Sequence, residues 1–137
     1  QASSIAGRIV WHGPVFDAAA LDAHYRAASL FVYPSLAEKG ETFGLAPLEA
    51  MAQGCPALVS DLDCFRDFIV ENCNGFVFDH RSAAPECVLA ARLAELMDGG
   101  ERLARAATQA HATAAEFSIE RIAAQYLCDF ETLRDGM

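Results

Sequence analysis

The chain has 137 residues, of which 53% are hydrophobic and 21% are charged, and its formal net charge is −9. This length and composition suit one domain, or a large piece of one, and argue against intrinsic disorder. The acidic balance argues against a surface for nucleic acid or anionic membranes, and no apolar run approaches the roughly eighteen residues that a membrane span needs.

Short apolar runs alternate with amphipathic segments along the first half of the chain. Residues 8–12 are apolar and stop at a Gly-Pro pair, which predicts a strand, and we expect its Trp11 to pack in the core. Asp17 is placed to cap a helix over residues 17–29. Further strands are predicted at 30–33, 57–60 and 75–78, with one helix following the glutamates of segment 41–49 and a short one at 64–70.

From Pro85 onward the chain becomes alanine-rich and helical. Helices are predicted from Pro85 to a Gly-Gly break at 99–100, from 101 to 115, and from a cap at Ser118 through the last residues. The alternation of strands and helices predicts an α/β fold, a Rossmann-like parallel sheet with helices on both faces that ends in several alanine-rich helices. We expect residues 1–137 to form a single partial domain.

Two carboxylates, Glu41 and Glu49, stand on either side of a Phe-Gly-Leu turn where a loop becomes a helix. Helical rise puts them roughly 12 Å apart, whereas two carboxylates that attack one glycosidic bond stand about 5 to 9.5 Å apart. This spacing favours two ends of one elongated ligand, with an anion held at the helix N-terminus between them. The alternative is that Glu41 caps or solvates the helix start and that Glu49 is an ordinary exposed glutamate.

The wider string resembles the retaining glycosyltransferases of family 4. The resemblance rests on residues 31–35 (FVYPS), 41–45 (ETFGL), 48–52 (LEAMA), Gly54, 56–60 (PALVS), 74–78 (NGFVF) and 116–118 (EFS). It implies the GT-B fold, two Rossmann-like domains of which the C-terminal one binds a nucleotide-sugar donor. The chain would then be an N-terminally truncated part of that C-terminal domain.

The resemblance also implies roles for single residues. Glu41 would be the catalytic residue that contacts the transferred sugar, and Glu49 would bind the ribose. Val15 and Phe16 match the loop that lines the nucleobase, where an aromatic ring could stack on the base. The donor sugar and diphosphate would meet the segment formed by Thr42, Phe43, Gly44, Leu45 and Ala46.

Two departures from the family pattern affect these expectations. Residues 36–40 lengthen the loop before Glu41, and this makes Glu38 a rival for its role; Glu41 is preferred because it alone keeps the spacing to Glu49 and adjoins Phe-Gly-Leu. The family's first two strands, with a Gly-Arg and a Lys near the diphosphate, are absent. Strand 8–12 would therefore lack its neighbours, and we expect a rearranged sheet edge or pairing with another chain.

The implied function is the donor-binding portion of a retaining glycosyltransferase, which transfers a sugar from a nucleotide-diphosphate-sugar such as a UDP-, GDP- or ADP-sugar. The acceptor, a glycan, lipid or small molecule, would bind through the missing N-terminal domain, and the chain alone is expected to be inactive. The alternatives are a nucleotide-sugar epimerase of the same fold and a non-catalytic nucleotide-sugar-binding module.

No cofactor, metal or nucleic acid is expected. The four histidines share no metal-binding spacing and are interpreted as surface or structural residues. Five scattered cysteines without a C-x-x-C pair favour reduced core thiols. Because no secretory leader is present, we expect a cytoplasmic protein, peripheral to the inner face of the membrane at full length.

Overall fold

A computed structural model describes residues 8–136 of the chain. Three short parallel strands form its sheet: β1 (Phe31–Tyr33), β2 (Ala57–Ser60) and β3 (Gly75–Phe78), in the order β1-β2-β3. Their register places Val32 beside Leu58 and Leu58 beside Phe76. These are three of the four strands that the apolar runs predict, and β2 and β3 begin and end at the predicted residues.

Helices occupy the stretches before, between and after the strands. They are α1 (Ala18–Ala27), α2 (Leu45–Ala52), the 3₁₀ helix η2 (Asp63–Asp67), α3 (Pro85–Met97), α4 (Gly100–Glu116) and α5 (Ile119–Asp135). The predicted caps are confirmed: Asp17 accepts a hydrogen bond from the Ala20 amide, and Ser118 accepts one from the Arg121 amide.

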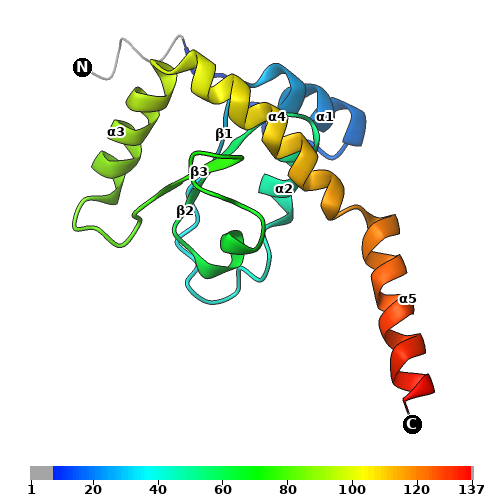
Figure 1. Ribbon diagram of the computed structural model, residues 1–137. Coiled ribbons are helices and arrows are strands. Elements are labelled where there is room, and N and C mark those ends of the chain that lie inside the picture. Colours follow the sequence, from blue (N-terminus) through cyan, green and yellow to red (C-terminus); the bar gives the residue numbers. More distant parts are fainter. Residues whose placement is uncertain (1–7, 137) are drawn as a thin grey trace.

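The sheet is packed on both faces, as the alternating pattern predicts. Ala57 and Val59 face a core completed by α2, η2 and the end of α4. Leu58 and Phe76 face the opposite core, formed with α3 and the start of α4. Figure 1 shows α2 and α3 on opposite sides of the strands. Because both faces of β2 are buried, neither face favours polar side chains, and this explains the continuous apolar run of β2.

The strand predicted at residues 8–12 is wrong, because none of these residues belongs to a strand. Trp11 is 90% exposed, so its predicted place in the core is wrong as well. The physical reason is pairing. In the Rossmann order two other strands separate this strand from β1, and the described residues supply no strand to bond its backbone.

The cysteines and α5 also differ from a uniformly packed domain. All five cysteines are free thiols, but only Cys55 is buried, and its burial raises the pKa of its thiol to about 11. The prediction of core thiols is wrong for Cys73, Cys87 and Cys128, which are exposed.

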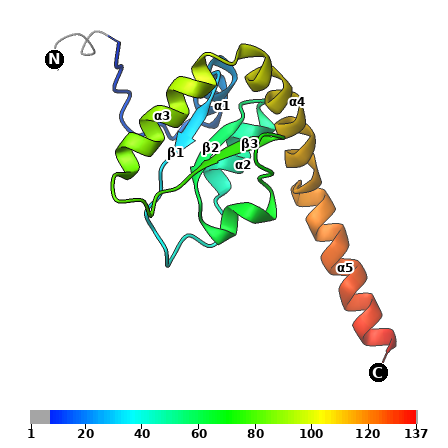
Figure 2. The same cartoon turned by 60° about the vertical axis from the view of Figure 1, so that its left-hand side comes forward.

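Helix α5 contains no buried residue and extends away from the sheet in both views (Figures 1 and 2). Among residues 8–136, no helix is both long enough and apolar enough to cross a bilayer.

Candidate functional site

The loop from β1 to α2 carries most of the predicted site residues and lies at the carboxyl end of the sheet. It ends at Gly44, which adopts φ 86° and ψ 61° as the residue before α2. A Cβ at Gly44 would lie 2.3 Å from Cε1 of Phe65. Only glycine satisfies both the left-handed backbone and this close approach to η2. The Phe-Gly-Leu turn is therefore built by tertiary contact as well as by local preference.

Phe43 is fixed by its side chain. The centroid of its ring lies 5.3 Å from that of Phe68 and 5.7 Å from that of Phe117. Phe43 therefore packs between the residue that follows η2 and the residue that follows α4. Among the described residues, no side chain caps the first turn of α2. The amides of Leu45 and Ala46 therefore lie at a helix start that no side chain satisfies, which is an arrangement suited to an anion.

Glu41 is held by the last residue of β1. The Tyr33 hydroxyl donates a hydrogen bond of 2.9 Å to Oε2 of Glu41, in a half-buried setting. This hydrogen bond, with burial, raises the pKa of Tyr33. The pKa of the Cys64 thiol is raised, first by burial and second by the negative charge of Glu41. Glu41 does not cap α2, because no side chain hydrogen-bonds the first turn of that helix among the described residues.

Glu49 lies one turn into α2 and has different surroundings. It is exposed and lines a hollow of about 420 Å³ with Leu48 and His111. Burial raises the pKa of Tyr25 on α1, and the negative charge of Glu49 adds to this. The two glutamates thus have different neighbours.

Glu38, the rival of Glu41, is bound to the loop after β3. Its Oε1 lies 2.8 Å from Nε2 of His80 and 2.9 Å from Nε of Arg81. Arg81 first, then His80, lowers the pKa of Glu38. Sequence reasoning did not single out either partner; the only available signal was their position just after a strand at the carboxyl edge.

The predicted nucleobase residues precede α1. Val15 is half-buried, whereas the side chain of Phe16 is 93% exposed, so its ring is open to solvent. The loop position is as expected, but the strand that was to lead into it is missing.

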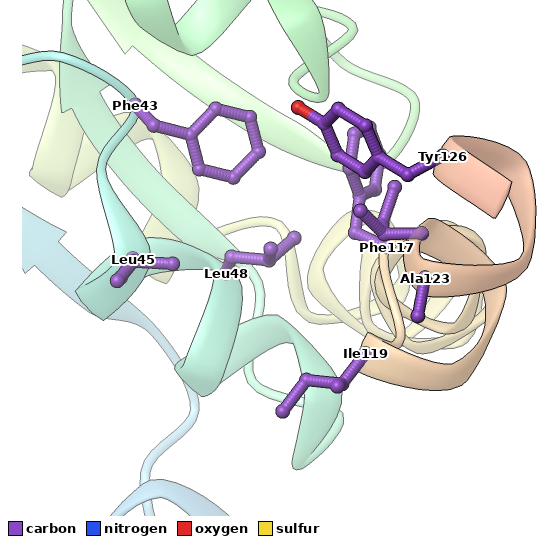
Figure 3. A pocket seen from close by; sticks show the side chains of 8 residues that line it. Phe43, Leu45, Leu48, Phe117, Ile119, Ala123 and Tyr126 are labelled. Carbon is purple, nitrogen blue, oxygen red and sulfur yellow. The ribbon is translucent and has the colours of Figure 1, made fainter. Parts of the chain in front are cut away.

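A second hollow, of about 550 Å³, lies between α2 and α5 beside Phe43 (Figure 3). Its walls are apolar side chains, including Leu45, Leu48, Phe117 and Tyr126. Such walls suit an apolar group and not a diphosphate. This hollow therefore differs in character from the uncapped start of α2 that it adjoins. Within residues 8–136, no cluster of three His, Cys, Asp or Glu side chains could hold a metal ion.

Comparison with known proteins places this arrangement in a family. The family model described as "Glycosyl transferases group 1" matches residues 2–113. The lipopolysaccharide core biosynthesis mannosyltransferase LpsB of Rhizobium meliloti is 34% identical over 80% of this chain and 30% of its own length. A D-inositol 3-phosphate glycosyltransferase of Xylanimonas cellulosilytica is 36% identical over 88% of this chain and 27% of its own. The chain thus spans less than a third of these relatives.

Solved structures share the fold. Sucrose-phosphate synthase from Thermosynechococcus elongatus matches 98% of this chain and 32% of its own with a TM-score of 0.77 and 22% identity. The C-terminal domain of a glycosyl transferase group 1 family protein (LpcC) from Francisella tularensis matches 86% of this chain and 60% of its own with a TM-score of 0.65 and 22% identity. Anabaena Alr3699/HepE, solved with UDP and glucose, matches 82% of this chain and 29% of its own with a TM-score of 0.70 and 21% identity. The chain belongs to the group 1 glycosyl transferases, with the fold of the C-terminal domain of GT-B proteins.

Proposed function

We propose that this chain is the donor-binding part of a retaining glycosyltransferase and takes a nucleotide-diphosphate-sugar. The observation that carries the proposal is the start of α2, where Gly44 and the uncapped amides of Leu45 and Ala46 stand between Glu41 and Glu49. A diphosphate is favoured at such a helix N-terminus. The related Anabaena protein was solved with UDP-glucose, which supports the same ligand class here.

Each glutamate has its own part in the proposal. Glu41, oriented by Tyr33, contacts hydroxyls of the transferred sugar. Glu49 binds the ribose hydroxyls, a role that carboxylates fill in other nucleotide-binding α/β folds. Thr42 and Phe43 line the approach to the sugar, and Val15 and Phe16 lie on the side of the nucleobase. The donor is a UDP-, GDP- or ADP-sugar and the acceptor a glycan, lipid or small molecule.

Calorimetric titration with UDP and UDP-glucose tests this assignment. Glu49→Gln should weaken both ligands by about tenfold to a hundredfold, the effect of losing roughly 1.5–3 kcal/mol from a hydrogen bond to a charged group. Glu41→Gln should weaken UDP-glucose and leave UDP unchanged. Glu86→Gln, an exposed glutamate on α3, is the control and should change neither. If both site variants bound UDP-glucose like the wild type, the assignment would be wrong.

Turnover assays separate the alternative functions. A protein that binds these nucleotides could still be an epimerase of the same fold or a non-catalytic module. For a chain of the relatives' length, release of UDP that depends on an added acceptor indicates transfer. Conversion of the donor sugar without an acceptor indicates epimerisation, and binding with neither reaction indicates a binding module.

A further inference from the structure

The loop that precedes Glu41 contains five residues, 36–40, in place of the two that the family pattern leads us to expect. Glu38 lies in the middle of this insertion, three residues before Glu41. A longer loop has more conformational freedom, which works against holding Glu41 in one place. Something must therefore restrain it if Glu41 is to meet a sugar in a defined position.

Glu38 supplies that restraint through residues from another part of the chain. Arg81 donates through Nε to Oε1 and through Nη2 to Oε2, both at 2.9 Å, so the contact is bidentate. The ring of His80, whose side chain is only 3% exposed, bonds Oε1 at 2.8 Å. A bidentate guanidinium and a buried ring define the carboxylate's position better than a lone surface ion pair would.

Arg81 also connects to the end of β2. Its Nη1 donates a hydrogen bond of 2.6 Å to the backbone oxygen of Asp61. The loops that follow β1, β2 and β3 are thereby joined at the carboxyl edge of the sheet. At the other side of the insertion, Tyr33 bonds Glu41 directly. The segment from Tyr33 to Glu41 is thus held at two points, by the Tyr33–Glu41 hydrogen bond and by the contacts of Glu38.

We propose that Glu38 is a positioning residue: bound by His80 and Arg81, it fixes the loop that presents Glu41 to the donor sugar. This inference rests on the proposed function for the role of Glu41, but the anchoring itself does not. In this proposal Glu38 positions the loop, and Glu41 is the carboxylate that contacts the sugar.

The anchoring can be read from proteolysis at a single peptide bond. Lys39 is the only lysine of the chain, so a lysine-specific protease cuts only within this loop. Arg81→Gln leaves the sequence around Lys39 unchanged and should raise the initial cleavage rate about twofold to fivefold, the range that an exposed ion pair supplies.

The matched control is Arg102→Gln. Arg102 on α4 forms an ion pair with Glu95 on α3, and Glu95 is also paired with Arg92. This pair lies away from the loop that contains Lys39. Arg102→Gln should leave cleavage at Lys39 unchanged. In a Glu38→Gln background, Arg81→Gln should add nothing further. A wild-type cleavage rate in Arg81→Gln, or equal acceleration by both single arginine variants, would overturn the anchoring.

Ligand titration tests the positioning of Glu41. Arg81→Gln should weaken UDP-glucose about twofold to fivefold and leave UDP unchanged, because only the sugar contact depends on the loop. Equal weakening of both ligands, or of neither, would contradict the inference. If the wild type binds neither ligand, the proposed function fails. In that case the NMR signals of the Tyr33 ring decide: they should shift in Arg81→Gln if the anchor holds Glu41, and unchanged signals would overturn the inference.

Discussion

At the scale of single residues, the close approach of Gly44 to Phe65 determines the geometry of the site. The positive φ of Gly44 and the ring lying against its α-carbon are separate constraints on the same position. Gly40, in the same loop, has φ 109° but open space around it. The two glycines therefore form a natural comparison between backbone strain alone and strain combined with a clash.

Gly44→Ala should lower the free energy of unfolding by about 2–4 kcal/mol, combining a left-handed alanine with overpacking against Phe65. Gly40→Ala should cost only the strain, about 1–2 kcal/mol. Urea unfolding followed by circular dichroism measures both values. Equal costs for the two substitutions would show that the contact with Phe65 yields freely and does not define the turn.

At the scale of elements, the loop between β1 and α2 is held by charges that titrate in acid. Arg81 and then His80 lower the folded-state pKa of Glu38 below its ordinary value of 4.5. Because the folded pKa is the lower one, the stabilisation is complete above about pH 4.5 and disappears as the pH falls through the folded pKa.

We therefore expect the loop to loosen as the pH falls below about 4.5 while the sheet stays folded, since Glu38 is exposed and its partners lie in the loop after β3. Amide NMR signals of residues 35–42, followed from pH 6 to pH 3, provide the measurement. Glu38→Gln should remove this local transition and Glu95→Gln should retain it. A loop that melts only together with β2 would contradict the expectation.

The last helix is a second element with a testable role. α5 has no buried residue, whereas α4 contributes Leu103, Ala106 and Ala110 to the two cores. Deleting residues 118–137 should lower the free energy of unfolding by at most about 1 kcal/mol, the value of one half-buried aliphatic side chain such as Ile122. Leu103→Ala should cost about 2–5 kcal/mol and is the comparison. Chemical denaturation measures both, and a deletion as costly as Leu103→Ala would show that α5 is part of the folding unit.

At the scale of the whole molecule, charge limits what this chain can do alone. Its net charge is −9, and the arginines at the carboxyl edge are engaged by carboxylates: Arg66 by Asp61 and Asp63, and Arg81 by Glu38 and Asp61. A leaving diphosphate needs cations or metal to stabilise its developing charge. Backbone amides at α2 can bind a diphosphate but supply only partial charges.

The 137-residue chain should therefore bind UDP-glucose without turning it over. A coupled assay for released UDP should show no rate above that of the free donor, with or without sugar acceptors. Sugar transfer by this chain alone, abolished by Glu41→Gln, would mean that the described residues already hold a complete active site.

The amino-acid sequence by itself determined the local elements of this protein. Apolar runs located β2 and β3, and Asp17 and Ser118 capped their helices. Each depends on neighbours in the chain, where side-chain period and capping chemistry act. The site at Glu41, Gly44 and Glu49 stays a prediction.

Tertiary structure decided the rest. Residues 8–12 carry a strand pattern but form none, because a strand needs partners that their own sequence cannot supply. Phe65 beneath Gly44, Tyr33 bonded to Glu41, and Glu38 bound by His80 and Arg81 are likewise contacts between separate segments. Spacing along the chain predicts which residues can share a face, but only packing of the sheet brings its loops together at one edge.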